Sequence, residues 1–245
     1  MMKRFFVIAL FVLGLGQLYA QPVRDTAWTK AGYFGLKLTQ VSLSSWSAGG
    51  ESALAFDSQI TYSADFKRDR QLWQNRLELG YGLTKNDGKS ARKTNDKIYF
   101  ASTYGYQIYK TLYWSALLNF NTQFAKGYDY NIEDSDFISK FMAPGYLMIG
   151  TGVTWSPNKI FTATFTPASW RGTIVADSRL SDEGAFGVDK GKHLLSEFGA
   201  NLKAEVNYEF LPNMKVYSRL ELYSNYLEDP QNVDVRWEVQ LNMAI

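Results

Sequence analysis

Residues able to perform catalysis are few in this 245-residue chain, which contains one histidine and no cysteine. The histidine, His193, lies shortly before Ser196, and a His and a Ser at the rim of a β-barrel could act as base and nucleophile. Such a pair also needs a group that orients the imidazole and donors that stabilise an oxyanion. The sequence identifies neither of them, so we expect no enzymatic activity.

Side chains that could bind a metal or a cofactor are also few. The absence of cysteine excludes disulfides and thiolate metal sites, and a single histidine excludes a multi-histidine metal site. Asp129, Glu133, Asp134 and Asp136 could offer oxygen ligands to Ca²⁺, but their spacing does not match a calcium loop. We expect no cofactor and no resident metal.

The charge balance gives no reason to expect a nucleic acid as partner, because the formal net charge is only +2. The most basic stretch runs from Lys89 to Lys97 and holds four cations. It could recognise a phosphate or a carboxylate, but such a run is more typical of a solvated loop tip. The chain is 46% hydrophobic and 16% aromatic, which excludes a disordered protein.

The N-terminus has the layout of a secretory signal peptide. Lys3 and Arg4 precede an apolar run over residues 5–16, and Leu18-Tyr19-Ala20 precedes Gln21. We expect residues 1–20 to be the signal peptide and residues 21–245 to form the mature domain. No later stretch approaches the roughly 20 apolar residues of a spanning helix, so the mature chain is either soluble or a membrane-spanning β-barrel.

The mature sequence alternates between apolar and polar residues with a period of two, as β-strands do. Between Leu194 and Phe210, for example, Phe198, Leu202 and Val206 share one parity and Glu197 and Lys203 the other. Strands are predicted over Tyr33 to Val41, Leu54 to Phe66, Trp73 to Leu83, Ile98 to Ile108, Leu112 to Phe124, Tyr146 to Trp155, Ile160 to Pro167, Leu194 to Phe210, Met214 to Tyr226 and Val233 to Ile245.

Long and short connections alternate between these strands, which is typical of a barrel with one end in the periplasm and the other outside the cell. Aromatic residues such as Trp73, Trp155 and Tyr226 fall near strand ends, where they would meet the lipid headgroups. We therefore predict an all-β fold, an antiparallel transmembrane β-barrel of about ten strands.

Charged residues on the polar strand faces would line the lumen of such a barrel. The candidate lumen charge network comprises Asp57, Arg76, Glu78, Glu197, Lys203, Glu205, Arg219, Glu221, Arg236 and Glu238. Buried charges must pair, so these side chains could form a salt-bridge lattice that braces a closed barrel. The same residues could instead line a charged, water-filled pore. Composition does not separate the two interpretations.

Several short segments form a recognisable set: Trp46-Ser47-Ala48-Gly49-Gly50-Glu51, Gly80-Tyr81-Gly82, Arg92-Lys93-Thr94-Asn95-Asp96 and Gly184-Ala185-Phe186-Gly187-Val188. Together they resemble the Bacteroidota family called domain of unknown function 3078, and the first and third are the most specific. The resemblance runs from about Trp28 to the last residue and implies an uncharacterised envelope protein of a Gram-negative bacterium. It implies no catalytic residue, ligand or activity. Members of the family carry a further hairpin at the C-terminus, so twelve strands are the alternative to ten.

The leading hypothesis is an integral outer-membrane β-barrel, exported through its signal peptide, that acts as a small channel or as a structural or accessory envelope component. Its partners would be outer-membrane lipid and other envelope proteins. The alternative is a soluble periplasmic β-barrel or sandwich that turns its apolar face inward and binds an apolar ligand. A barrel hydrolase is a distant third hypothesis.

Overall fold

The computed structural model describes residues 27–43, 51–132 and 136–243. The predicted signal peptide lies outside these residues, as do Trp46 to Gly50 and the last two residues of the final predicted strand. The described part of the chain is all-β apart from two short helices. No helix in it is long and apolar enough to cross a membrane.

Ten antiparallel strands form one sheet, in which each strand pairs with its neighbours along the chain. The strands are β1 (Trp28–Val41), β2 (Ala53–Arg68), β3 (Gln71–Asn86), β4 (Arg92–Tyr109), β5 (Leu112–Thr122), β8 (Gly145–Trp155), β9 (Phe161–Ile174), β10 (Leu194–Leu211), β11 (Met214–Asn225) and β12 (Val233–Met243). All ten predicted strands are present, with shifted ends.

Long and short connections lie at opposite ends of the sheet, as predicted. The long-loop end holds the β5–β8 connection, with β6 (Gly127–Tyr128) and β7 (Phe137–Ser139), and the β9–β10 connection, with α1 (Ser178–Asp182) and η1 (Ala185–Gly187). The short-turn end holds the hairpins β2–β3, β4–β5, β8–β9 and β10–β11. The prediction of a long loop from Lys85 to Asn95 was wrong, because β4 already begins at Arg92.

The strand predicted to stop at Pro167 continues to Ile174. Proline has no N–H for the ladder, which made it look like a strand end. Here the pairing of β9 with both neighbours shifts around Pro167, between Phe165 and Ala168 on one side and between Thr166 and Ser169 on the other. A bulge thus accommodates the proline and reverses which face the following residues occupy.

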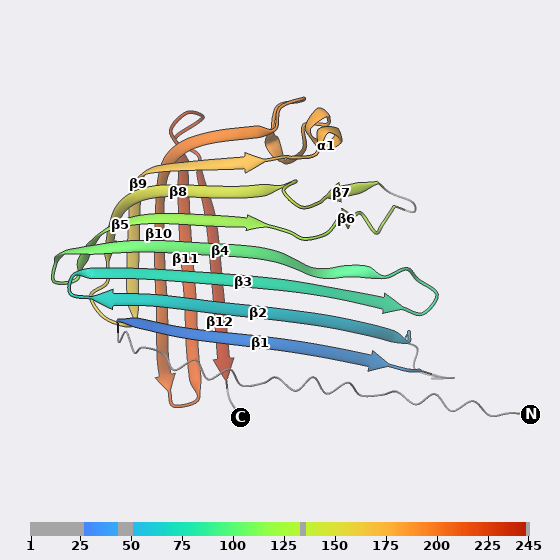
Figure 1. The fold of residues 1–245 in the computed structure, drawn as a ribbon, viewed down its shortest axis with the longest axis horizontal. Helices are drawn as coiled ribbons and strands as arrows, with labels where there is room; N and C mark the ends of the chain where they lie inside the picture. Colours follow the sequence, from blue (N-terminus) through green and yellow to red (C-terminus); the bar gives the residue numbers. More distant parts are fainter. Residues whose placement is uncertain (1–26, 44–50, 133–135, 244–245) are drawn as a thin grey trace, which may run out of the picture.

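The sheet bends strongly at β8, β9 and β10, so that β11 and β12 run across the direction of β1 to β5 (Figure 1). Glycines permit the bend. A Cβ on Gly152 would lie 2.0 Å from the carbonyl oxygen of Phe165, and one on Gly199 would lie 2.0 Å from that of Ser224. Only glycine allows the backbones to approach this closely.

The sheet is not closed into a barrel, which corrects the predicted fold. β1 and β12 are its two edge strands and are not paired with each other. Pairing needs strands that lie alongside one another about 4.8 Å apart, whereas β12 crosses the direction of β1 (Figure 1). The strand number and the antiparallel order were predicted correctly, but closure was not.

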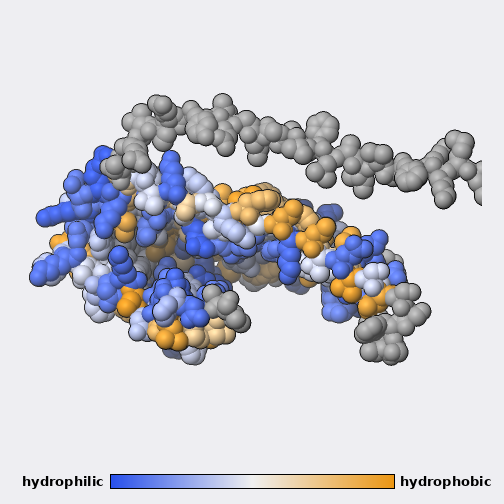
Figure 2. All heavy atoms as spheres, turned by 90° about the horizontal axis from the view of Figure 1, so that it is seen from below, coloured by the Kyte–Doolittle hydropathy of each residue, from blue (hydrophilic) through white to orange (hydrophobic). Residues whose placement is uncertain are grey.

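Strand register divides the side chains between two faces. The outward face is apolar, and along β1 and β2 it carries Phe34 opposite Ile60 and Leu38 opposite Phe56. Figure 2 shows hydrophobic residues gathered along one arm of the sheet. The inward face is polar and turns β4 and β5 toward β11 and β12, since residues of all four strands line one cavity. The buried hydrophobic cluster around Leu180 is small and lies at the long-loop end.

Candidate functional site: the inward face and its cavity

All ten residues of the predicted lumen charge network lie on the inward face. The register carries this face from strand to strand, since Glu78 is opposite Tyr99, Tyr99 opposite Asn121 and Asn121 opposite Tyr146. Across β10, β11 and β12, Glu205 is opposite Arg219, and Arg219 is opposite Glu238. Alternation along single strands was therefore sufficient to place these residues together.

On β3 and β4 the charges form a compact group. Glu78 accepts from Arg76 at 2.5 Å and from Lys97 at 2.5 Å, so one carboxylate serves two cations. Asp57 accepts a hydrogen bond of 3.1 Å from the Asn95 amide. Three of these residues belong to the predicted network, and Lys97 and Asn95 extend it.

A second group spans β10, β11 and β12. Lys203 pairs with Glu205 at 3.1 Å, and Arg219 pairs with Glu238 at 2.6 Å. Glu205 also accepts a hydrogen bond of 2.8 Å from the Tyr217 hydroxyl. Four of the ten predicted residues thus form two ion pairs within one strand-to-strand patch.

The third group centres on Arg171 of β9. Its guanidinium bonds both oxygens of Glu197, at 2.7 and 2.8 Å, and lies 3.2 Å from Asp234. It also stacks on the ring of Tyr223, with Cζ 3.9 Å from the ring centroid. Arg171 is not in the predicted charge network, because the predicted strand ends at Pro167. Asp234 was missed too, although it alternates with Val233 and Val235.

A cavity of about 770 Å³ opens among these side chains at the long-loop end. Its wall holds Arg171, Arg236, Glu197, Glu221 and Asp234. Its polar lining is completed by the amides of Asn119, Asn121 and Asn201, the rings of Tyr99, Tyr146 and Tyr223, and the Thr173 hydroxyl. This size falls within the range of about 300–1,000 Å³ that is usual for small-molecule sites.

The polar groups of the cavity wall differ in whether they have a hydrogen-bond or ion-pair partner. Glu221 accepts a hydrogen bond of 3.0 Å from Asn201, whereas Arg236 has no ion-pair or hydrogen-bond partner within residues 27–43, 51–132 and 136–243. Tyr223 is 5% exposed, and its hydroxyl is buried without a hydrogen-bond partner in the same described ranges. The guanidinium of Arg236 is therefore a donor group in the cavity wall that no described residue uses.

Phe186 of η1 reaches the cavity from the long β9–β10 connection. Its backbone has φ 58° and ψ 24°, between Gly184 at φ 73° and Gly187 at φ 81°. A left-handed conformation is costly for an aromatic residue, and such strain is found preferentially at functional sites. The segment is held by the cluster of Val175, Leu180 and Val188 beneath it.

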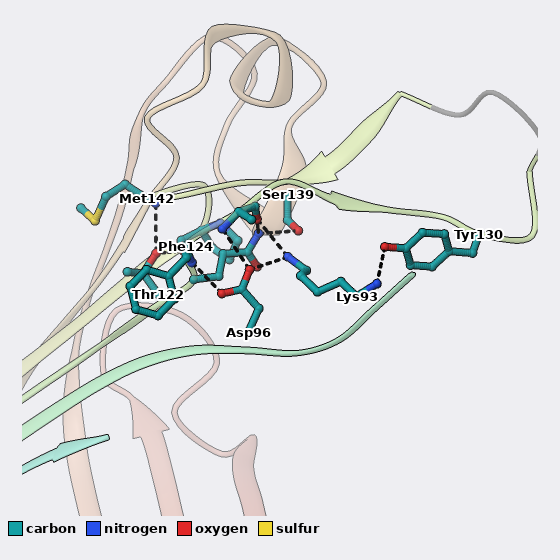
Figure 3. Close-up of polar contacts among 10 residues, drawn as sticks. Lys93, Asp96, Thr122, Phe124, Tyr130, Ser139 and Met142 are labelled. Carbon is teal, nitrogen blue, oxygen red and sulfur yellow. Dashed lines mark hydrogen bonds and ion pairs between the residues drawn. The ribbon is translucent and has the colours of Figure 1, made fainter. Parts of the chain in front are cut away.

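The basic Lys89 to Lys97 stretch contains a buried clamp rather than only a solvated tip (Figure 3). Lys93 and Asp96 form an ion pair of 2.6 Å. Asp96 accepts hydrogen bonds from the backbone N–H groups of Phe124 and Ala125, and Tyr130 accepts one from the N–H of Lys93. The clamp fixes the β5–β8 connection onto β4.

The side chains of His193 and Ser196 each bond a different partner. The imidazole Nδ1 of His193 lies 2.7 Å from the carbonyl oxygen of Val175. Ser196 lies on the outward face and accepts a hydrogen bond of 2.6 Å from the indole of Trp170. Of the acidic residues considered for Ca²⁺, Glu133 and Asp134 lie outside the described residues, and no metal-binding group of three is found within the described ones.

The fold and site define an all-β protein with one ten-stranded antiparallel sheet, an apolar outward face and a polar inward face. Residues 38–128 match the family model described as a protein of unknown function, DUF3078, which supports the family that the sequence resemblance indicated. The matched part includes the Lys93–Asp96 clamp, while Arg171 and Arg236 lie beyond it. No curated protein and no solved structure matches this chain.

Proposed function

We propose that this chain is an integral outer-membrane protein of a Gram-negative bacterium, with its outward face in the lipid hydrocarbon and its inward face forming a polar interior. The observation that carries the proposal is that indole donors on the outward face are hydrogen-bonded within the protein. In hydrocarbon no water satisfies an exposed donor, so each donor needs a partner within the protein.

Three outward tryptophans meet this requirement in the same way. Each indole N–H donates to a serine hydroxyl on the adjacent strand: Trp73 to Ser102 at 2.9 Å, Trp170 to Ser196 at 2.6 Å and Trp237 to Ser218 at 3.0 Å. Around the first pair the bonds continue. Ser102 donates to Asn75 at 2.8 Å, and Asn75 donates to the carbonyl oxygen of Ala64 at 3.1 Å.

The apolar residues of the outward face also suit lipid. Leu38 is 70% exposed and Trp237 is 71% exposed. The outward positions of β11 and β12 carry no charged side chain. Between Trp73, Tyr104, Trp170 and Phe198 this face is hollowed by a groove of about 850 Å³, which an acyl chain could fill.

Aromatic rings gather at the short-turn end, where a headgroup girdle would lie. Trp28 contacts Phe66 at 5.3 Å and Trp73 at 5.9 Å between ring centroids, and Trp155 contacts Phe161 at 5.6 Å. Aromatic girdles of this kind flank the apolar band of outer-membrane barrels.

The two edge strands must be covered if the sheet lies in hydrocarbon, because open edges leave N–H and C=O groups unpaired. β1 runs from the short-turn end to the long-loop end and β12 runs back, so the two edges have the opposite chain sense that antiparallel pairing needs. In the open sheet β12 crosses the direction of β1, so pairing requires the sheet to curve further. We propose that β1 and β12 pair in the bilayer, which closes the sheet. Since the chain lacks native cysteine, cysteines placed at Tyr33 or Lys37 and at Glu238 or Gln240 would report this pairing by disulfide formation.

For its role we propose a structural or accessory envelope component with a braced interior rather than an open channel or an enzyme. The ion pairs of Glu78 with Lys97, Arg171 with Glu197 and Arg219 with Glu238 join neighbouring strands on the inward face and would fill a narrow lumen. Planar-bilayer recordings of the purified protein should therefore show no large, stable, single-step openings. Such openings would instead favour a channel.

The soluble alternative requires the apolar face to form an internal core. Phe56, Ile60 and Leu202 are instead 37%, 41% and 38% exposed on the outward face. Within the described residues the apolar face therefore does not form the internal core that this alternative requires.

Membrane fractionation tests the proposal. The full chain should be recovered in the outer-membrane fraction and should migrate differently on gels before and after boiling. A fluorophore attached to a single cysteine at Ile60 or Leu79 should be quenched by lipid-borne quenchers. The same fluorophore at the neighbouring inward positions Gln59 and Glu78 should not be quenched. Recovery as a soluble periplasmic monomer would contradict the proposal.

A further inference from the structure

We propose that the cavity at the long-loop end is a binding site for a neutral oligosaccharide. The inference rests on the proposed function only for the side of the membrane on which the site opens. It is drawn from three properties of the cavity wall: its balance of charge, its mixture of donors and acceptors, and its aromatic contact.

The charge balance opposes an ionic ligand. Arg171 and Arg236 face a cavity that also holds Glu197, Glu221 and Asp234. An anion would meet three carboxylates and a cation would meet two guanidinium groups, so either would be desolvated beside like charges. A neutral ligand avoids this cost.

The polar lining suits hydroxyl groups, each of which can donate and accept. Asn119 and Asn121 add amides with both capacities, and Glu221 adds carboxylate acceptors. Arg236 contributes donors with no partner in the described part of the chain. Tyr223, whose ring carries the stacked Arg171, belongs to the same wall, and its buried hydroxyl has no partner within the described residues. A buried polar atom without a partner calls for a bound water or ligand.

Phe186 supplies the aromatic surface against which the C–H face of a sugar ring can pack. The residue is 36% exposed and lines the cavity, on a left-handed backbone between two glycines. The surrounding small cluster supports the strained turn without help from the ligand. The site is thus organised before binding, which lowers the cost of association.

Isothermal titration calorimetry on the full chain in detergent micelles tests the inference. The probes are maltohexaose, cellohexaose, mannohexaose and xylohexaose, with oligogalacturonate and oligochitosan as acidic and basic comparators. We expect at least one neutral probe to bind with 1:1 stoichiometry and more tightly than both charged comparators.

Two variants locate the binding. Arg236→Gln and Phe186→Ala should each raise the dissociation constant about tenfold or more, since a charged donor or an aromatic contact is lost. Alanine has the same backbone preference as phenylalanine, so Phe186→Ala removes the ring without changing the conformational preference of the turn. Lys215→Gln is the matched control: it removes an inward cation at the short-turn end, paired with Glu209 at 3.0 Å, and should leave binding unchanged.

The inference is overturned if no neutral probe binds, if a charged comparator binds more tightly, or if Lys215→Gln weakens binding as much as Arg236→Gln. Circular dichroism checks that each variant is folded. If Phe186→Ala is not folded, the inference is tested by Arg236→Gln alone. Oligosaccharide binding by a chain that is not recovered in the outer membrane would remove the proposed function and leave this inference standing.

Discussion

Lys93 and Asp96 form an ion pair of 2.6 Å whose side chains are only 14% and 2% exposed. Both residues lie near the start of β4, yet most of their other partners belong to the β5–β8 connection. Lys93 Nζ donates to the carbonyl oxygen of Ala125 at 2.9 Å, and Asp96 accepts from two backbone N–H groups there. A charged pair thus holds a long loop against the sheet.

Replacing Lys93 should destabilise this loop strongly. Lys93→Met leaves the Asp96 carboxylate buried without its cation, which costs about 3–5 kcal/mol. We expect faster proteolysis between Gln123 and Gly145 and a lower free energy of unfolding. Lys89→Met is the matched control, because the Lys89–Glu51 pair is about half exposed on both sides, is screened by solvent and should contribute little to stability. Equal effects of the two substitutions would contradict the buried clamp.

Removing a serine partner on the outward face should destabilise the protein in lipid. In Ser218→Ala the indole N–H of Trp237 loses its acceptor, which costs about 1–3 kcal/mol if the face lies in hydrocarbon. If water reaches the face, the indole bonds to water and the cost is small.

A double-mutant cycle of Ser218→Ala and Trp237→Phe isolates the coupling free energy between the two side chains. It is measured by unfolding in lipid vesicles. The coupling should be clearly favourable in vesicles. A coupling near zero would contradict a lipid-facing position for Trp237.

Adding one methyl group at Gly152 should disrupt the bend of the sheet. The new Cβ of Gly152→Ala would lie 2.0 Å from the Phe165 carbonyl oxygen, so the backbone must move, at a cost of about 1–3 kcal/mol or more. Gly105→Ala is the control, because its nearest heavy atom lies 3.6 Å away. Refolding yield and the denaturant midpoint should fall for the first variant and stay constant for the second.

Acid should weaken the cap of α1. The side chain of Asp177 bonds Lys140 and accepts from the N–H of Leu180 at 3.0 Å, and these contacts hold the pKa of its carboxyl below the usual value. A lowered folded pKa contributes stability that is present above the unfolded pKa of about 3.9 and is lost as the pH falls through the folded pKa.

Amide hydrogen exchange at Leu180, corrected for its intrinsic pH dependence, measures this loss. Protection should decrease across that acidic range in the wild type. In Asp177→Asn, which can still cap the helix but carries no charge, protection should be lower at neutral pH and should not titrate. The same titration in both proteins would assign the effect to another group.

The alternation of side chains along each strand determined most of the architecture. A strand turns successive residues to opposite faces whatever surrounds it, so Phe198 and Glu197 could be assigned to different faces from their order alone. The same rule brought all ten predicted charges to one face, and the antiparallel order of consecutive strands placed hairpins and long loops at opposite ends. The presence of ten strands therefore followed from local pattern and turn residues.

Pairing between particular charges was decided by the tertiary structure. Arg219 bonds Glu238 of β12 rather than Glu205 of β10, although both are directly opposite in register. Register fixes which residues are neighbours, but the choice between two equivalent neighbours depends on rotamers and on the competing Tyr217 hydroxyl. Lys93 and Asp96 looked solvated for a related reason, since a loop far along the chain buries them.

The bending of the sheet and the closure of its edges were the features least predictable from the sequence. The bulge at Pro167 changes which face Arg171 occupies, and a period of two cannot reveal an inserted residue. Phe186 adopts its left-handed backbone only because the loop beneath it is packed around Leu180. Whether the edges β1 and β12 meet depends on the accumulated twist and coil of ten strands, which no single strand encodes. The sequence thus determined the strands and their faces, while the cavity and the open edges arose from how the whole sheet curves.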